Sequence, residues 1–146
     1  MTDAPMTVDR MAALHAACFT TPRPWTATEI AALLADPLCF ALTAPGGFLI
    51  GRAVAGEAEV MTLAVDPALR RQGIGADLLN RFLQTARNRG AETAFLEVSA
   101  ANTAALALYA RGGFAPSGCR KGYYVTPEGQ KLDAIVMSRP LSAASD

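Results

Sequence analysis

Apolar residues recur at helical spacing early in the chain, behind residues that favour helix starts. Thr7 can cap a first helix, because its side-chain oxygen can accept a hydrogen bond from a free backbone N–H of the first turn. Thr26 and Glu29 form a capping box ahead of a second apolar stripe, and the Asp-Pro pair at 36–37 closes that stripe. The chain before residue 38 therefore predicts two helices.

The third helix has the clearest pattern in the sequence. It begins near Gly73, places apolar side chains four residues apart, and ends with basic residues and Gly90. Cations in the last turn and a glycine just past it are typical of a helix C-terminus. Asn102 can cap a fourth helix that runs through Tyr109 and stops at the glycine pair 112–113.

Short apolar or alternating segments bounded by turn residues predict six strands, at residues 38–43, 48–54, 59–65, 93–98, 122–126 and 133–138. The last two strands are expected to form a hairpin, and residues 93–98 are nearly all apolar, as in a strand covered on both faces. Strand–helix–strand connections imply some parallel pairing, whereas hairpins imply antiparallel pairing. The order ααβββαβαββ thus predicts the α/β fold class, with a mixed sheet and helices on both of its faces.

Length and composition indicate one globular domain. The 146 residues are 51% apolar and 18% charged, and no Pro/Gly/Ser-rich linker divides them. Residues 1–146 are expected to form a single domain with a disordered tail at about 142–146. The 13 basic residues balance the 13 acidic ones, so neither nucleic acid nor an anionic membrane is an expected partner. Any anion site must be built locally.

Few residues are suited to binding a metal. His15 is the only histidine, and Cys18, Cys39 and Cys119 are scattered, so no zinc site, no histidine-based triad and no metal are predicted. We interpret His15 as a satisfied core or surface histidine without a role. The odd number of cysteines, the lack of a signal sequence and the absence of an apolar run of about 18 residues favour a reduced, cytoplasmic setting.

Residues 61–76 carry the strongest candidate for an anion site. A buried strand ends at Asp66-Pro67, and the segment from Arg70 to Gly75 then opens the third helix. Free N–H groups and the positive end of a helix dipole bind phosphate, and glycines let the backbone approach it closely. The segment lacks the Lys-Ser/Thr of nucleotide-hydrolysing loops and the third glycine of dinucleotide-binding loops. A tight strand–helix connection without a ligand explains the same residues equally well.

The spacing Arg70-x-x-Gly73-x-Gly75 after an apolar strand resembles motif A (Q/R-x-x-G-x-G/A) of the GNAT family of N-acetyltransferases. The resemblance implies that acetyl-CoA is the acetyl donor and that backbone N–H groups from Arg71 to Ala76 hold its pyrophosphate. It also implies that the strand at 63–65 hydrogen-bonds the pantetheine arm. The implied cofactor-binding residues are Leu63, Ala64, Val65, Arg70, Arg71, Gln72, Gly73, Ile74, Gly75, Ala76 and Asn102.

A second block of matches lies further along the chain. Residues 96–114 resemble the family's later motif, L-E-V-x-x-x-N-x-A-A-x-x-L-Y-x-x-x-G-F. The segments at 24–26, 123–124 and 133–137 resemble the RimI-type branch, which acetylates the N-terminal alanine of a small-subunit ribosomal protein. The resemblance implies the GNAT fold, with a mixed, mostly antiparallel central sheet flanked by helices on both faces. Because the chain is short before Thr7, the family's usual first strand is expected to be abbreviated or missing.

Glu97 is the candidate general base. It stands inside an apolar strand, where burial of an unpaired carboxylate is costly, and partial burial would raise its pKa toward neutrality. An α-amine has a pKa near about 8 and a lysine near about 10.4, so an N-terminal amine is easier to deprotonate by roughly 3 kcal/mol. The alternative is that Glu97 sits at a strand end and reaches solvent or an arginine.

Four aromatic residues are candidates for the site. From its spacing alone, Tyr109 is an ordinary core residue, whereas the resemblance implies that it is the general acid that protonates the departing CoA thiolate. Trp25, Tyr123 and Tyr124 are either core or rim aromatics or, by resemblance, the border of a groove for the substrate's N-terminal peptide.

The predicted function is transfer of an acetyl group from acetyl-CoA to a protein N-terminal α-amine, with the N-terminal alanine of a small-subunit ribosomal protein as the expected acceptor. Two alternatives stay open. One is a GNAT enzyme that acetylates a small amine, an amino acid or a lysine side chain, and the other is a non-catalytic module that binds acetyl-CoA. The expected partner is the N-terminal peptide of a protein substrate, and the expected form is a monomer.

Overall fold

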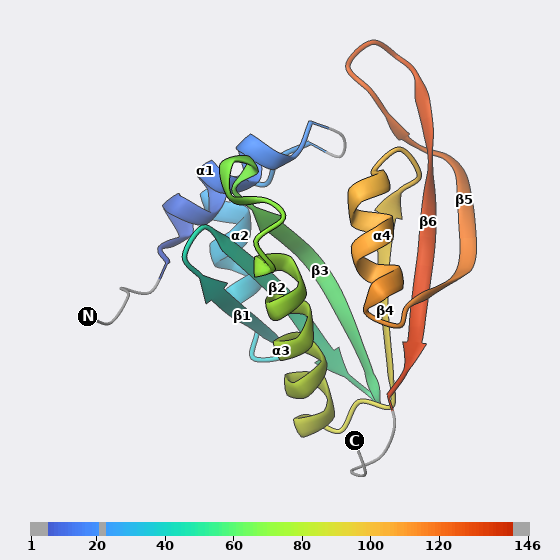
Figure 1. Cartoon of the computed structure of the whole chain (residues 1–146). Coiled ribbons are helices and arrows are strands. Elements are labelled where there is room, and N and C mark those ends of the chain that lie inside the picture. Colours follow the sequence, from blue (N-terminus) through green and yellow to red (C-terminus); the bar gives the residue numbers. More distant parts are fainter. Residues whose placement is uncertain (1–5, 21–22, 142–146) are drawn as a thin grey trace.

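The computed structural model describes residues 6–20 and 23–141 and has an α/β architecture around one six-stranded sheet (Figure 1). The helices are α1 (Val8–Cys18), α2 (Ala27–Leu34), the short 3-10 helix η1 (Pro67–Leu69), α3 (Ile74–Asn88) and α4 (Thr103–Arg111). The strands are β1 (Cys39–Ala44), β2 (Gly47–Val54), β3 (Glu57–Val65), β4 (Thr93–Ser99), β5 (Ala115–Val125) and β6 (Lys131–Pro140). The predicted order of helices and strands is confirmed, with η1 as an addition.

The sheet is mixed and mostly antiparallel, as predicted. Its strands lie in the order β1-β2-β3-β4-β6-β5, and β3 and β4 are the parallel neighbours. These two strands pair at only three positions, from Glu57 with Thr93 to Glu59 with Phe95. Beyond Glu59 they separate, and in Figure 1 they form a V whose arms part toward the top of the view. The separation leaves a gap in the middle of the sheet.

Two apolar clusters, one on each face of the sheet, hold the helices in place. On one face α3 packs through Leu78, Phe82 and Ala86, all of which are fully buried. On the other face α1 and α2 bury Met11 and Ile30 against the sheet. Full burial of a large apolar side chain contributes about 1.5–3 kcal/mol relative to exposure, so both clusters stabilise the layered arrangement. Helices therefore cover both faces, as the sequence predicts.

Side chains cap the N-termini of α1, α2 and α4. The capping residues are Thr7, Thr26 and Asn102, whose side-chain oxygens accept backbone N–H groups at 3.1 to 3.2 Å. Glu29 completes the predicted capping box by accepting the backbone N–H of Thr26 at 2.9 Å. The longest helix differs from these three. α3 begins directly after Gly73, and none of the described side chains caps it.

The start of β5 corrects the sequence-based prediction, because this strand begins at Ala115 rather than at residue 122. Its first half contains Pro116 and Gly118, residue types that are rare inside strands. The strand forms because it pairs with β6, and two register irregularities accommodate the poor strand formers. Tertiary pairing therefore overrides local preference at this edge of the sheet.

β4 is not covered on both faces as its apolar sequence suggested. Buried and half-buried residues alternate along it, because one face packs against the α3 cluster and the other face opens to a cavity. α1 is the first element of the described residues, and residues 1–5, on which the expectation of an abbreviated or missing first strand bears, lie outside them. The predicted tail at 142–146 lies outside the described residues.

Candidate active site

Two cavities meet at the gap between β3 and β4. The first, here called the aromatic cavity, has a volume of about 310 Å³ and is lined by Glu97 and by Trp25, Tyr123 and Tyr124. The second, the loop cavity, has a volume of about 540 Å³ and is lined by the loop before α3 and by α4. Both cavities are lined by Phe19, Leu63, Asn102, Ala105 and Tyr109. The shared lining allows two substrates to approach from different sides and to meet at the gap.

The uncapped N-terminus of α3 borders the loop cavity. The first backbone N–H groups of a helix have no acceptor within the helix, so here they are available to an anion. Arg71 has φ 66° and Gly73 has φ 83°, so two left-handed residues lead into the helix. A non-glycine residue in this region is strained, and such strain clusters at ligand-binding loops. The exposed Arg70 and Arg71 add positive charge to this concave backbone.

The loop cavity brings together the predicted cofactor-binding residues, except that Gln72 is not part of its lining. The two glycines of the motif have different roles in the structure. A methyl group at Gly75 would lie 3.2 Å from Leu108 Cδ2, so this glycine lets α3 and α4 pack closely. Around Gly73, no described heavy atom lies within 4 Å of an added methyl group, and its positive φ is the feature that requires glycine.

The end of β3 offers an unpaired backbone edge to the same cavity. Residues 63–65 pair with β2 on one side, but pairing with β4 on the other side stops at Glu59. Half of the backbone N–H and C=O groups in this stretch therefore point into the gap. The Val65 carbonyl accepts a hydrogen bond from the Cys18 thiol at 3.2 Å. Such an edge can hydrogen-bond an extended, amide-containing ligand.

Glu97 faces the aromatic cavity from β4, two residues beyond the last pair with β3. Its side chain is 26% exposed, and Arg120 Nε on β5 lies 2.9 Å from Glu97 Oε2. The sequence left two interpretations of Glu97 open, a partly buried carboxylate at the site or one that reaches an arginine. The structure shows both features, because the carboxylate lines a cavity and also pairs with Arg120. The ion pair lacks the alignment of a hydrogen bond, and no described group hydrogen-bonds this shielded oxygen. The oxygen can therefore take a proton without breaking an aligned hydrogen bond.

Tyr109 lies in the wall between the two cavities. It projects from α4, is 7% exposed and packs edge-on against Phe114 with the ring centroids 6.0 Å apart. Burial raises the pKa of the Tyr109 hydroxyl well above its usual value. The phenol therefore keeps its proton at neutral pH, as a general acid must before the reaction, and the same burial makes it a weaker acid than an exposed tyrosine.

Aromatic side chains form the rim of the aromatic cavity. Tyr123 and Tyr124 come from β5 with their ring centroids 5.2 Å apart, and the Arg120 guanidinium lies over the Tyr123 ring at 4.9 Å. Burial, and next the charge of Glu97, raise the pKa of the Tyr124 hydroxyl. Trp25 forms the opposite side of the rim. The structure therefore brings the three predicted substrate-binding aromatics together around Glu97.

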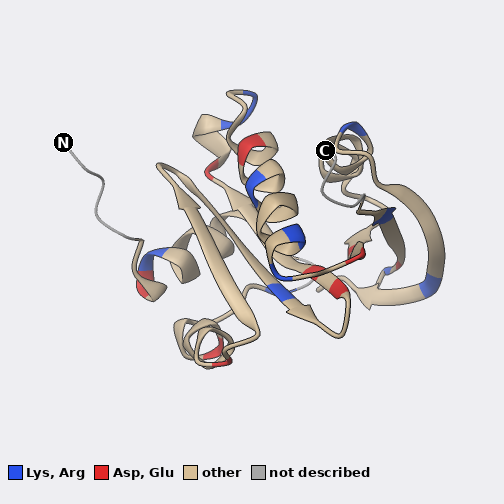
Figure 2. Ribbon diagram, turned by 90° about the horizontal axis from the view of Figure 1, so that it is seen from below, with Lys and Arg blue, Asp and Glu red and all other residues tan. Residues whose placement is uncertain are grey.

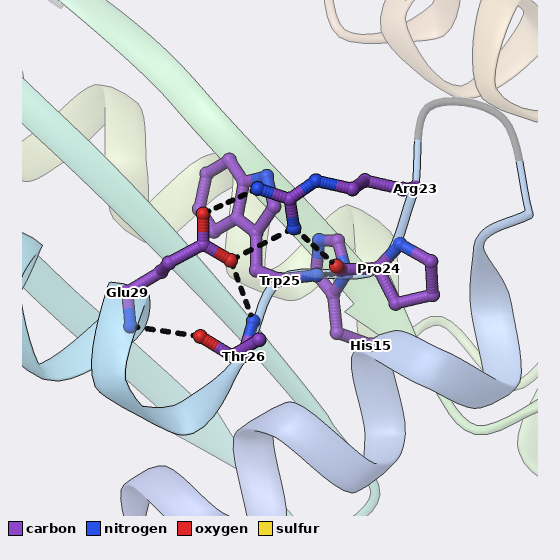
Figure 3. A network of polar contacts seen from close by, with 6 residues as sticks. All are labelled: His15, Arg23, Pro24, Trp25, Thr26 and Glu29. Carbon is purple, nitrogen blue, oxygen red and sulfur yellow. Dashed lines mark hydrogen bonds and ion pairs between the residues drawn. The ribbon is translucent and has the colours of Figure 1, made fainter.

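His15 fixes Trp25 in this position (Figure 3). The backbone N–H of Trp25 donates to His15 Nδ1 at 3.1 Å, so Nε2 carries the imidazole proton and donates to Thr62 Oγ1 on β3 at 3.0 Å. The ring is 1% exposed and stacks between Phe19 and Trp25, with centroid distances of 4.2 and 5.0 Å. Burial lowers the pKa of His15 to about 4, although the charge of Glu29 opposes the shift.

Arg23 and Glu29 also hold the loop that carries Trp25. Arg23 pairs with the Glu29 carboxylate at 2.6 and 2.9 Å and donates to the Pro24 carbonyl at 3.0 Å (Figure 3). The hydrogen bond from Arg23 is the main reason that the pKa of Glu29 falls to about 2. Consecutive backbone groups at 24–26 are thus satisfied by side chains, which holds the rim in one conformation.

Glu59 is a cavity residue that sequence reasoning did not single out. It lines the aromatic cavity from β3 and is half-buried, and its pKa is raised first by burial and then by the charge of Glu97. The only signal in the sequence is its position in the alternating run that begins β3. Phe19, Thr62 and Arg120 were also missed, because their place in the site depends on contacts between distant elements.

Charge and metal-binding groups are otherwise dispersed. Figure 2 shows basic and acidic residues interspersed over the ribbon, in keeping with the balanced composition. Within residues 6–20 and 23–141, no three His, Cys, Asp or Glu side chains gather closely enough to hold a metal ion. None of the helices in the described part of the chain has the length and hydrophobicity that a bilayer span needs.

Residues 9–114 match the acetyltransferase (GNAT) family. This segment contains the loop before α3, Glu97 and Tyr109. The chain belongs to the GNAT family. The resemblance seen in the Arg70–Gly75 motif is thereby confirmed, and the chain is an N-acetyltransferase.

Within the GNAT family, the chain is similar over nearly its whole length to the [ribosomal protein bS18]-alanine N-acetyltransferase of Escherichia coli (strain K12). The two are 39% identical over 140 residues, which cover 93% of this chain and 94% of the relative. The N-alpha-acetyltransferase RimI of Mycobacterium tuberculosis is 39% identical over 124 residues, or 79% of this chain and 77% of that protein. These similarities support the RimI-type branch of the family.

Solved structures confirm the fold. The crystal structure of the ribosomal-protein-S18-alanine N-acetyltransferase from Escherichia coli has a TM-score of 0.82 at 33% identity, covering 95% of this chain and 90% of that one. Arabidopsis thaliana NAA60, solved in complex with acetyl-CoA, has a TM-score of 0.80 over 94% of both chains, but at 18% identity it supports the fold alone.

Proposed function

We propose that this GNAT enzyme transfers the acetyl group of acetyl-CoA to the N-terminal alanine of a small-subunit ribosomal protein, the counterpart of bS18. The observation that carries the proposal is the shared wall of the two cavities, with an anion-binding loop on one side and Glu97 among aromatic side chains on the other. The choice of acceptor rests on the near-full-length similarity to the Escherichia coli enzyme.

The loop cavity suits acetyl-CoA by the chemistry of its lining. The backbone N–H groups of residues 71–76 would hold the pyrophosphate, with Arg70 and Arg71 supplying positive charge. The open edge of β3 at 63–65 would hydrogen-bond the amide-containing arm. When it is bound, acetyl-CoA supplies an acetyl group already activated as a thioester.

Two side chains of the protein would move protons during transfer. Glu97 accepts a proton from the ammonium form of the acceptor, which leaves the nitrogen with a free lone pair. Tyr109, in the wall between the two cavities, donates its phenolic proton to the leaving sulfur. Because both side chains line the aromatic cavity and Tyr109 also lines the loop cavity, the amine and the thioester would be held close together, and this proximity lowers the barrier.

The rim of the aromatic cavity would bind the first residues of the peptide. Trp25 is held by its hydrogen bond to His15, and Tyr123 is stacked under Arg120, so both walls are ordered before the peptide arrives. Ordering a binding surface in advance reduces the entropy lost on association. The volume of about 310 Å³ leaves room for a small N-terminal residue such as alanine.

Mass spectrometry of a peptide panel tests this proposal. The wild-type protein is incubated with acetyl-CoA and with matched peptides that begin with Ala, Ser, Met or Lys, alongside free amines and an N-terminally blocked peptide that contains lysine. We expect acetylation on the α-amine of the Ala peptide, with kcat/KM at least about tenfold above the free amines. Preferential acetylation of lysine side chains or small amines would reject the N-terminal acceptor. Binding of acetyl-CoA without turnover of any amine would reject enzymatic acetyl transfer to these acceptors.

A further inference from the structure

Glu59 and Glu97 face the same cavity from neighbouring strands. Glu59 pairs with Phe95 in parallel register, and paired residues project from the same face of a sheet. Glu97 follows Phe95 by two residues and so projects from that face as well. Both carboxylates line the aromatic cavity at the narrow end of the gap, where pairing between β3 and β4 stops.

The other charged groups near Glu59 balance one another and leave its own charge unmatched. Arg120 lies 2.9 Å from Glu97 and so balances that carboxylate. On β2, Arg52 stands opposite Glu59 and lies 3.8 Å from Asp36, so it is shared between two acids. His15 is neutral at pH 7 because its pKa is lowered to about 4, and Tyr123 and Tyr124 are phenols. Among these described groups, the carboxylates of Glu97 and Asp36 are matched by the guanidinium groups of Arg120 and Arg52, which leaves the negative charge of Glu59 unbalanced.

The environment of Glu59 favours a cation beside it. Burial raises the pKa of its carboxyl, and the charge of Glu97 raises it further, while Arg52 opposes the shift. A half-buried carboxylate with a second carboxylate nearby is poorly compensated, and an incoming positive charge would relieve this cost. An α-amine with a pKa near about 8 is mostly an ammonium ion at neutral pH, so the acceptor arrives with the complementary charge.

We propose that Glu59 binds the acceptor amine in its ammonium form and holds it beside Glu97, so that the enzyme selects acceptors by their positive charge before the proton is removed. This inference rests on the proposed function. Glu59 keeps its negative charge throughout, and the proton of the ammonium passes to Glu97. Glu59 is thus a specificity residue, which separates acceptor binding from proton removal.

Binding to the CoA-loaded protein tests this role without turnover. Calorimetry would compare an Ala-initiated peptide with its des-amino analogue, in which a propionyl group replaces the alanyl residue and the terminal charge is absent. We expect the wild-type protein to prefer the charged peptide by about tenfold or more, and Glu59→Gln to lose most of that preference. Glu57→Gln is the matched control, since Glu57 lies two residues earlier on β3 and is exposed outside the cavity. This control should keep the wild-type preference.

Steady-state kinetics supply the second readout. Glu59→Gln should raise the peptide KM about tenfold, with kcat within about twofold of wild type and with unchanged acetyl-CoA affinity as the check on folding. An unchanged charge preference, or a loss in kcat at unchanged KM, would overturn the proposal, and the second result would make Glu59 a base. If the wild-type protein acetylates no N-terminal peptide, the proposed function fails. If it acetylates the peptide but Glu59→Gln binds both peptides as wild type does, only the role of Glu59 fails.

Discussion

Acidification should destabilise the protein through His15. The folded-state pKa of about 4 lies below the ordinary value of 6.5, so between these pH values the unfolded chain binds a proton that the native protein does not. Stability is therefore fully present above about pH 6.5 and falls as the pH drops toward 4. The shift corresponds to roughly 3 kcal/mol, because each pKa unit is worth about 1.36 kcal/mol. Protonation would also remove the acceptor at Nδ1 that holds the backbone N–H of Trp25.

NMR can follow the titration of His15 without overlap from other imidazoles, because His15 is the only histidine in the sequence. The imidazole C–H proton signals of the native protein, free of any histidine tag, should titrate by NMR with a midpoint near 4 or not at all before acid unfolding. In urea denaturation, the free energy of unfolding of wild type should fall between pH 7 and pH 4 by about 3 kcal/mol more than that of His15→Gln. This difference does not depend on how stable the variant is at pH 7. A native midpoint near 6.5, or parallel stability profiles for the two proteins, would refute the reasoning.

Five further substitutions have defined expectations. Glu97→Gln should lower kcat roughly 100-fold at pH 7 and leave the acetyl-CoA Kd nearly unchanged in calorimetry, and unchanged kcat would remove Glu97 from the role of base. Tyr109→Phe keeps the ring and should also lower kcat roughly 100-fold, with a normal Tm, whereas full activity would exclude a role as general acid. Arg70→Ala should weaken acetyl-CoA about tenfold in the same calorimetry, and an unchanged Kd would count against the anion site. Gly51→Ala would place a methyl group 2.5 Å from Phe40 Cζ on β1 and should lower the free energy of unfolding by about 1–3 kcal/mol. Gly118→Ala, whose added methyl group would lie 3.6 Å from Val136 Cβ, should leave it nearly unchanged. Equal costs for the two variants in urea denaturation would contradict the packing argument.

Local signals predicted the helices well. Thr7, Thr26 and Asn102 cap the helices that follow them because a capping hydrogen bond spans only two or three residues. β5 was predicted too short because its first half has poor strand formers, and only pairing with β6 makes it a strand. Information about that pairing is not contained in residues 115–121 themselves.

The site was predicted where its residues belong to continuous motifs. The loop before α3 and the segment from Glu97 to Tyr109 are each short, so their contribution to the cavities follows from two adjacent stretches of sequence. Glu59 and His15 were not predicted to take part. The role of Glu59 depends on where β3 and β4 separate, and Thr62, the partner of His15, lies 47 residues away. Such relations exist only in the folded chain.

The three-position pairing of β3 and β4 also has a consequence for the order of events. Because the strands part beyond Glu59, the two cavities meet at the gap, with the loop before α3 on one side and Glu97 on the other. Occupation of one side therefore leaves the other side accessible, which suits kinetics through a ternary complex. A single inhibitor that joins a CoA-like half to a peptide half could pass through the gap and occupy both cavities. The tether would give each half a high effective concentration at its cavity.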